Sequence, residues 1–312
     1  MSAGVVTPIP DALDGARADR AVAQLLDVGV SAARRLMLAR RVRMNGRLVK
    51  KGELVHAGDI VVLEGSGAWL VPSLDGASAL VPLYVDEHVI IVDKPAGMPC
   101  HPLVPGEGGT VVDALAMSFP EIAAASLDPR EAGLVHRLDT GTSGCLAIAR
   151  DRARWLALRE AFASGVVVKR YLALVHGRVE QPIVIDTHLV HDARDRRRMR
   201  LASAGEEGAQ HCQTRARTVA VGAGHALVEV EAHGGRRHQV RAHLAASGHP
   251  LVGDVLYGAH GGGDPAGADV AWHLLHASAL GLPGLPVLTA PVPPAFRDAC
   301  ARRGLDPARW LC

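Results

Sequence analysis

The chain has 312 residues, a length that suits about two domains of ordinary size. Apolar residues make up 48% and charged residues 21%, a normal globular balance that allows the chain to bury cores of its own. The net charge of +2 excludes a generic polycation, so any surface for nucleic acid must be local.

The five cysteines are odd in number, scattered, and without a C-x-x-C pair, which disfavours a disulfide framework or a zinc site. The N-terminal residues lack the basic start and apolar core of a signal peptide. No apolar run approaches the roughly 20 residues that a membrane helix needs. These features predict a cytoplasmic protein without a membrane segment.

Residues 1–14 contain two prolines and small polar residues, and they are expected to form a flexible tail. Asp19 can cap a helix over residues 19–26, and Ser31 can cap a second helix that runs to about residue 41. Together with the strands that follow, these helices predict a small α/β module over residues 15–65.

Alternating apolar and basic residues at 41–44 predict a half-buried strand. Asn45-Gly46 is a strong signal for a tight hairpin turn, and a return strand is expected at residues 48–49. The apolar run 60–63 predicts a buried strand that closes the module.

Residues 66–80 lie in a stretch rich in Gly, Ser, Ala and Pro and are predicted to be a linker. A second domain is expected over residues 81–312. Its strands and helices do not alternate strictly, which favours an α+β fold with a mixed sheet over a doubly wound one. Strands are expected at 89–92, 146–148, 171–175 and 226–231, and helices at 110–117, 152–163 and 237–246.

The N-terminal module concentrates positive charge. Between residues 17 and 64 ten basic residues face five acidic ones, a local excess of +5 that is larger than the net charge of the whole chain. Such clusters bind phosphates through ion pairing and counterion release, although a solvated helix face without a partner is the simpler alternative. The candidate RNA-binding surface comprises Arg34, Arg35, Arg41, Arg43, Arg47, Lys50 and Lys51.

The order of elements in this module favours the RNA-binding interpretation. The segments "RADRAVAQLL", "RRVRMNGRLVKKG" and "HAGDIVVLEG" resemble the alpha-L RNA-binding module of a ribosomal small-subunit protein and of several RNA-modifying enzymes. The resemblance implies contact with RNA backbone or shape, because few aromatic residues are available for stacking.

The segment "HRLDTGTSG" begins at His136 and combines Arg137 and the carboxylate of Asp139 with small residues. A carboxylate flanked by cations can stay ionised and attack, or can stabilise a developing positive charge. A polar turn capped by Asp139 is the structural alternative. A nucleophilic triad on Ser143 is a weak alternative, because residues so close in sequence rarely adopt that geometry.

Five segments in order resemble the RluA-type pseudouridine synthases. They are "DEHVIIVDKPAGMPCHP", "HRLDTGTSG", "VVKRYLALVHG", "GGRRHQVRAHLAASGHPLVGDVLYG" and "LLHASAL". The resemblance covers about residues 81–296 and implies a mixed, largely antiparallel sheet with flanking helices. It implies an enzyme that isomerises uridines in RNA, with ribosomal RNA favoured over transfer RNA because of the N-terminal module. A non-catalytic RNA-binding protein with the same fold is the other alternative.

The resemblance also implies residue roles. Asp139 is the expected catalytic carboxylate, acting either by attack on the sugar or by removal of a sugar proton. An ion pair with Arg236 is expected to keep it charged, and Tyr171 is expected to stack on the target base. Further residues are expected to hold phosphates or to support the site structurally, namely Arg137 and Lys169 for phosphates and His136 and His238 for support.

Pseudouridine formation requires no metal or other cofactor, and the histidines show no metalloenzyme pattern such as H-E-x-x-H. The target base must leave its stack to reach the pocket, so base flipping is expected. Gly141, Gly234 and Arg237 depart from the family's usual residues, which leaves the substrate preference open. A basic stretch at 194–200 could contact RNA or be a solvated loop, and a monomer is expected.

Overall fold

The computed structural model describes residues 5–25, 30, 33–34, 37, 42–49, 52–63, 80, 82–103, 107–126, 128, 130–258 and 269–306. It divides into two compact units, each made of two chain segments. Unit 1 comprises Met1–Ser78 and His101–Gly133, and unit 2 comprises Ala79–Cys100 and Leu134–Cys312. Within the described ranges, no helix has the length and apolar character that crossing a membrane would require.

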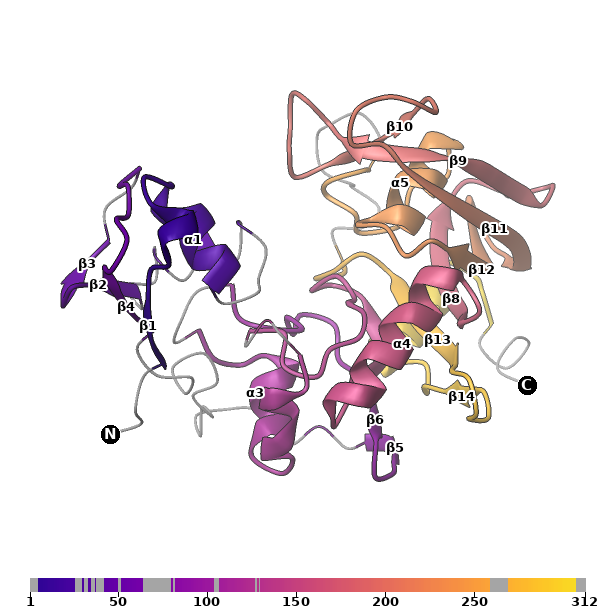
Figure 1. Ribbon diagram of the computed structural model, residues 1–312. Coiled ribbons are helices and arrows are strands. Elements are labelled where there is room, and N and C mark those ends of the chain that lie inside the picture. Colours follow the sequence, from indigo (N-terminus) through magenta and orange to yellow (C-terminus); the bar gives the residue numbers. More distant parts are fainter. Residues whose placement is uncertain are drawn as a thin grey trace. The chain divides into compact units, whose positions relative to one another are not determined.

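The N-terminal part of unit 1 contains a four-stranded antiparallel sheet and helix α1 (Figure 1). The strand order is β1-β4-β2-β3, and Ala21, Val22 and Met44 belong to the core beneath it. The strands predicted at 42–44 and 60–63 are confirmed. The elements are β1 (Val5–Pro8), β2 (Val42–Met44), β3 (Arg47–Leu48), β4 (Ile60–Leu63) and α1 (Ala18–Leu25).

The flexible tail expected at residues 1–14 is wrong for its described part. Strand β1 pairs antiparallel with β4, and a short 3-10 helix, η1 (Asp11–Leu13), follows it. Ile9 and Leu13 are buried in the module core. Pro8 ends a strand at the edge of the sheet, where a missing backbone donor is tolerated.

Two predicted helices of unit 1 have different outcomes. The helix predicted from Asp19 begins at Ala18, so Asp19 lies in its first turn and does not precede it. The helix predicted over residues 31–41 falls mostly outside the described residues.

The second segment of unit 1 is also helical. Helix α3 (Val111–Ala116) confirms the helix predicted at 110–117, and it is followed by the 3-10 helix η3 (Pro120–Ala124). Thr110 accepts a hydrogen bond from the Asp113 backbone N–H, and the Asp113 side chain accepts one from the Thr110 backbone. This reciprocal capping satisfies donors that the first turn of a helix otherwise leaves unpaired.

Unit 2 is built on a ten-stranded sheet of order β10-β9-β11-β12-β8-β13-β7-β6-β5, with β14 paired to β13. All strand pairs are antiparallel except β13 with β7, so the predicted α+β fold with a mixed, largely antiparallel sheet is confirmed. The strands are β5 (Pro82–Val85), β6 (Val89–Lys94), β7 (Ser143–Ala149), β8 (Val168–His176), β9 (Ile183–His191), β10 (Met199–Ala202), β11 (Gln210–Val221), β12 (His225–His233), β13 (Leu275–Gly281) and β14 (Leu288–Thr289).

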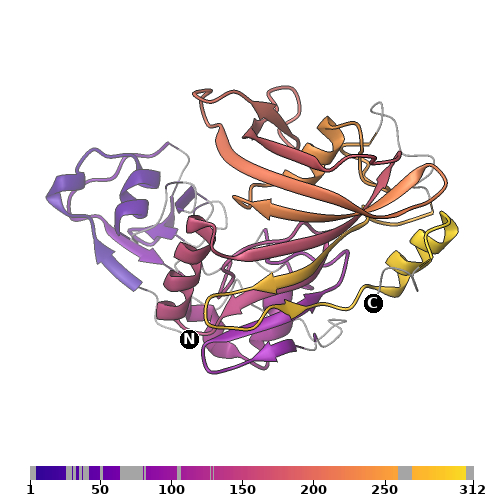
Figure 2. The same cartoon turned by 90° about the vertical axis from the view of Figure 1, so that its right-hand side faces the viewer.

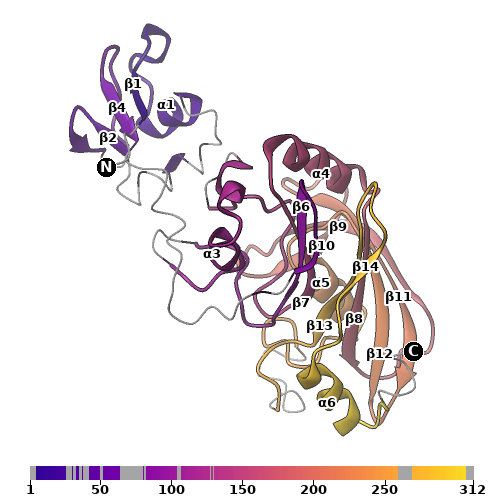
Figure 3. The same cartoon turned by 90° about the horizontal axis from the view of Figure 1, so that it is seen from below.

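Helices cover both faces of this sheet, which is why several strands are apolar at consecutive positions. On β8, Ala173 and Val175 share a buried cluster with Val240 of α5, whereas Leu174 shares one with Phe296 of α6. Figure 2 shows the long strands β11 and β12 running together, and Figure 3 shows β7, β13 and β8 side by side. The helices are α4 (Arg152–Ser164), α5 (Gln239–Ala246) and α6 (Pro294–Arg302).

Candidate active site

Asp139 lies in the turn that enters β7. Its carbonyl accepts a hydrogen bond from the Thr142 backbone N–H at 3.0 Å, which closes the turn. The next carbonyl, that of Thr140, accepts hydrogen bonds from the Gly97 backbone N–H at 2.7 Å and from Lys94 Nζ at 3.1 Å. The turn is therefore fastened to the loop that follows β6.

Lys94 is completely buried and has a structural role in holding these two loops. Its ammonium group donates to the carbonyls of Pro95, Met98 and Thr140 at 3.0, 2.6 and 3.1 Å. Burial lowers the pKa of Lys94 to about 8, against the opposing effect of Cys100 and Asp139. Three carbonyls thus replace the water that the buried cation has lost.

The Asp139 carboxylate is paired with Arg241 of α5. Arg241 Nη1 donates to Asp139 Oδ2 at 2.8 Å, while its Nε and Nη2 donate to the two oxygens of Asp254 at 2.7 and 2.9 Å. The side chains of Asp254 and Arg241 are 0% and 9% exposed, whereas that of Asp139 is 24% exposed. One guanidinium therefore joins a fully buried carboxylate to one that a substrate can reach.

Asp254 holds this arginine in place. Its carboxylate also accepts hydrogen bonds from the backbone N–H groups of Leu256 and Tyr257 at 3.0 and 3.1 Å. Burial acts to raise the pKa of Asp254, but the hydrogen bonds and charge of Arg241 prevail, and the net direction is downward. The same pairing raises the pKa of Arg241 despite its burial, so both groups stay charged.

The expected ion pair between Asp139 and Arg236 is wrong, because the structure gives this place to Arg241. Arg236 precedes helix α5, and its Nε donates to the carbonyl of His211 at 3.1 Å. Arg241 lies within α5, on the face that is buried in the domain. The two arginines are five residues apart in one segment, but Arg236 precedes the helix whereas Arg241 lies within it.

Gln239 fixes the start of α5. It is buried, and its side-chain amide nitrogen donates to the carbonyls of Gln213 and His233, at 2.8 and 3.0 Å. Its amide oxygen accepts the backbone N–H of Arg236 at 3.0 Å. These bonds tie the loop before the helix to β11 and β12, so the position of Arg241 is determined by the sheet.

His238 and Tyr257 complete the surroundings of Asp139. His238 has a left-handed backbone conformation at the helix N-cap, and its Nε2 lies 3.8 Å from Asp139 Oδ1. Its Nδ1 is hydrogen bonded to the Tyr257 hydroxyl at 3.1 Å, and that hydroxyl accepts the Met199 backbone N–H at 2.6 Å. Burial lowers the pKa of His238 to about 4, so the imidazole is neutral at pH 7.

Tyr171, the expected stacking residue, lies on β8 opposite Val230 of β12 and is packed against the cluster that includes Val240 and Leu244. Burial, followed by the charge of Asp139, raises the pKa of Tyr171, so the phenol stays neutral. The structure thus places Tyr171 and Arg241 on the same side of the sheet.

The predicted phosphate-binding residues lie in two places. Lys169 is close to the loop that carries Arg236, because a Cβ added to Gly235 would lie 3.2 Å from Lys169 Nζ. Burial, and then the positive charge of Arg236, lower the pKa of Lys169 to about 8. Two neighbouring cations favour an anion between them. Arg137, beside Asp139 in sequence, is exposed.

The other residues of "HRLDTGTSG" are structural. His136 Nε2 accepts the Ala147 backbone N–H at 3.0 Å, and its ring stacks on Phe162. Ser143 is buried and hydrogen bonded to His276 Nδ1 at 2.9 Å, while the other nitrogen of His276 faces the Ala290 carbonyl at 3.3 Å. Both ring nitrogens of His276 thus face partners other than a carboxylate, so the triad alternative gains no support.

The predicted RNA-binding surface of unit 1 is described only in part. Arg34 is paired with the buried carboxylate of Asp19 at 2.6 Å, and Arg47 with Glu53 at 2.5 Å. Arg43 donates to the Gly46 carbonyl. The remaining four residues, Arg35, Arg41, Lys50 and Lys51, lie outside the described residues.

Sequence reasoning missed the residues that position Asp139, which are Lys94, Arg241, Asp254 and Tyr257. The available signal was the lone acid Asp254 in the otherwise apolar segment "PLVGDVLYG". A buried carboxylate there requires a cation, and the arginine on the inward face of the preceding helix is the nearest candidate.

Comparison with known proteins agrees with this geometry. The model of the family described as RNA pseudouridylate synthase matches residues 88–246. An uncharacterised RNA pseudouridine synthase of Mycobacterium bovis is 34% identical over 290 residues, covering 88% of each chain. A ribosomal large subunit pseudouridine synthase D of Xylella fastidiosa is 38% identical over 204 residues, covering 63% of this chain and 59% of that relative.

Among solved structures, human RNA pseudouridylate synthase domain containing 4 aligns with a TM-score of 0.56 at 25% identity. The alignment covers 72% of this chain and 92% of the human one. The match to the Xylella relative spans less than two thirds of that protein, whereas the mycobacterial match spans most of both chains. On the family match and the mycobacterial relative together, this chain belongs to the RNA pseudouridylate synthase family.

Proposed function

We propose that this chain is an RNA pseudouridine synthase that isomerises specific uridines in large-subunit ribosomal RNA. The observation that carries the proposal is the partly exposed carboxylate of Asp139, held by a buried arginine inside the family's sequence match. The ribosomal substrate is favoured by the name of the Xylella relative and by the basic N-terminal module. The proposed compartment is the cytoplasm.

The proposed reaction breaks the C1′–N1 bond of uridine and forms a C1′–C5 bond. The hydrogen at C5 leaves as a proton, and N1 gains one, so no redox partner is required. Positive charge develops on the sugar as the first bond breaks, and a carboxylate beside it stabilises that charge. Asp139 acts either by attack on C1′ or by removal of the C2′ proton, which gives a glycal.

Arg241 donates to Oδ2 of Asp139, which leaves Oδ1 for the sugar. Tyr171 is assigned to the face of the flipped uracil, and the cation pair of Lys169 and Arg236 to a backbone phosphate. Arg137, which is exposed next to the carboxylate, is assigned to a second phosphate. The N-terminal module is assigned to RNA outside the site.

The test is release of tritium from RNA labelled at C5 of uridine. Wild-type protein is expected to release tritium from large-subunit ribosomal RNA of a strain lacking this gene. Asp139→Asn is expected to lower the rate by about three orders of magnitude or more while RNA binding is retained. The matched control Asp186→Asn, at an exposed carboxylate of β9, is expected to behave as wild type.

Transfer RNA from the same strain identifies the substrate class. Release from transfer RNA alone would keep the chemistry and overturn the ribosomal assignment. Equal release by wild type and Asp139→Asn would remove Asp139 from its role. Absence of release from both RNAs would refute the enzyme and favour an RNA-binding protein.

A further inference from the structure

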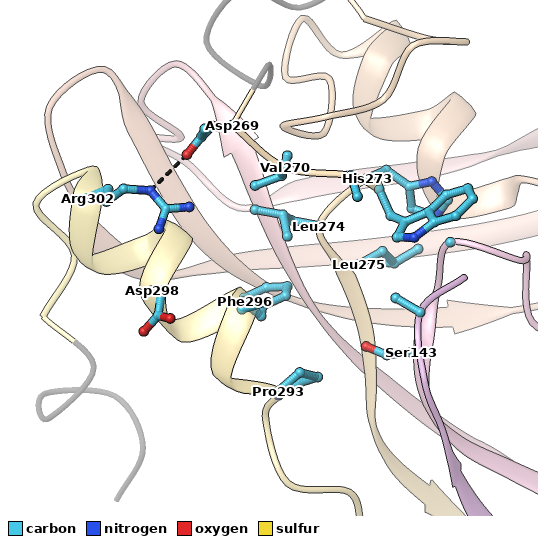
Figure 4. Close-up of a pocket in the computed structure, with 15 residues that line it drawn as sticks. Ser143, Asp269, Val270, His273, Leu274, Leu275, Pro293, Phe296, Asp298 and Arg302 are labelled. Atoms are coloured by element: carbon cyan, nitrogen blue, oxygen red, sulfur yellow. Dashed lines mark hydrogen bonds and ion pairs between the residues drawn. The ribbon is translucent and has the colours of Figure 1, made fainter. Parts of the chain in front are cut away.

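A cavity of about 260 Å³ adjoins the Asp139 turn within unit 2. Figure 4 shows Phe296 and Asp298 of α6 on one side of it and Ser143, Leu274 and Leu275 on the other. Gly141 and Trp272 also line it, so the cavity and the Asp139 turn have Gly141 in common.

We propose that Trp272 and this cavity bind the base of an unpaired nucleotide that flanks the target uridine. The inference rests on the proposed function.

Trp272 is held in place by two glycines. A Cβ on Gly97 would lie 2.9 Å from the indole Nε1, and a Cβ on Gly141 would lie 3.2 Å from Cε3. These atoms are at opposite edges of the indole, so the ring lies across both glycines. The two loops are themselves joined by the hydrogen bond from Gly97 N–H to the Thr140 carbonyl.

The rest of the indole is open to solvent. Trp272 is 44% exposed, and it is the only tryptophan or phenylalanine in the described ranges that is classed as exposed. Aromatic residues make up only 3% of the chain. A fixed, partly exposed indole beside a cavity lined by both apolar and polar residues is a stacking surface for a planar partner, and every nucleobase has such a face.

The position of Trp272 favours RNA as the source of that partner. Gly141 is two residues from Asp139, so their Cα atoms are at most about 7 Å apart. A flipped uridine stays covalently joined to both neighbouring nucleotides through their phosphates. A uridine held at Asp139 therefore brings its immediate neighbours within reach of the indole. The neighbour must be unpaired, because a paired base does not present a free face to a side chain.

The experiment uses an unmodified transcript of large-subunit ribosomal RNA. Three variants of the full chain separate stacking from packing. Trp272→Phe keeps an aromatic face, Trp272→Leu keeps apolar bulk against the glycines without one, and Trp272→Ala removes both. Val287→Ala is the control, at an exposed apolar residue that directly precedes β14.

Tritium-release kinetics give KM and kcat, and quenching of indole fluorescence by RNA reports stacking directly. We expect Trp272→Leu to raise KM about 10-fold with kcat nearly unchanged, because stacking on a flanking base is uniform binding. Trp272→Phe should stay close to wild type, and RNA should quench wild type more than Trp272→Phe.

Replacing the flanking nucleotides one at a time by abasic residues completes the test. At the neighbour that stacks, the abasic transcript should raise the KM of wild type and leave that of Trp272→Leu unchanged. Equal kinetics of wild type and Trp272→Leu, with wild type active, would overturn the inference alone. An inactive wild type would refute the proposed function and, with it, this inference.

Discussion

The Asp139 site and the N-terminal module both contain arginine–carboxylate pairs, but the pairs differ in burial. In the site, Arg241 and Asp254 are removed from water, and every donor and acceptor must find a protein partner. In the module, Arg34 is 57% exposed although its partner Asp19 is buried, and Arg47 is also exposed. The buried pairs of Arg241 determine where the Asp139 carboxylate lies. The exposed arginines of the module remain accessible to phosphates and to dissolved ions.

The largest effect is expected from breaking the buried pair. Arg241→Met leaves the Asp254 carboxylate buried without its cation, which should lower the free energy of unfolding by about 3–5 kcal/mol. Urea unfolding followed by circular dichroism measures it. Arg236→Met, five residues earlier, should cost less than about 1 kcal/mol because that arginine donates to a single carbonyl. Similar losses in the free energy of unfolding of the two variants would contradict the claim that only Arg241 neutralises a buried carboxylate.

Acid should destabilise unit 2 through its buried histidines. Burial lowers the pKa of His238, His243 and His273 to about 4 each, from an ordinary value of 6.5. Between those values the unfolded chain binds more protons, so this stability is complete above pH 6.5 and is lost as the pH falls towards 4. Each group contributes a slope of up to about 1.4 kcal/mol per pH unit.

Urea unfolding at pH 7, 6 and 5 measures that slope, and His243→Gln removes one titrating group at a place outside the active site. The variant should lose stability more gently with falling pH than wild type does. An identical slope would show that His243 is not held neutral by burial.

The sequence predicted the α+β fold and most of its strands and helices, whereas the arginine that pairs with Asp139 was predicted wrongly, for a physical reason. The segment "HRLDTGTSG" indicated Asp139 through its resemblance to the RluA-type pseudouridine synthases, and the role of this carboxylate stays a prediction. The helix at 237–246 was also predicted, but the resemblance pointed to Arg236, which precedes the helix, and not to Arg241 within it. Arg241 is the buried arginine because it pairs with the buried carboxylate of Asp254, which lies in the loop after the helix.

The N-terminal strand β1 shows a different failure. Its four residues carry little periodic signal, and their pairing depends on β4, more than 50 residues later in the chain. Contacts at that separation are not visible in a local pattern of apolar and polar residues. Unit 1 also includes residues 101–133, and this could not be predicted because it depends on contacts between distant segments of the chain.

A smaller effect is expected at Tyr257, which links the site to the hairpin of β9 and β10. Tyr257→Phe removes the hydroxyl that accepts the Met199 N–H and contacts His238. The loss should be about 1 kcal/mol in urea unfolding, with a several-fold rise in KM for RNA. Val255→Ala, at an exposed side chain in the same turn, is the control. An unchanged KM would show that the hairpin does not depend on this bond.

The smallest effect is expected from the exposed charges of the module. Arg43→Ala with Arg47→Ala should weaken RNA binding several-fold at low salt and lower the slope of log affinity against log salt by about one to two. The variant and wild type should converge at high salt. Arg217→Ala, exposed on β11, is the matched control. A loss that is independent of salt would point to a folding defect in the module.

The most direct test of the account compares Arg241→Lys with Arg236→Lys in single-turnover release of tritium from ribosomal RNA. A lysine cannot bridge Asp139 and Asp254 as a guanidinium does, so Arg241→Lys should slow the chemical step by about 100-fold. Arg236→Lys should stay within about 10-fold of wild type, since its charge is kept. If Arg236→Lys slows the reaction as much as Arg241→Lys, the buried Arg241 does not position the Asp139 carboxylate for the reaction.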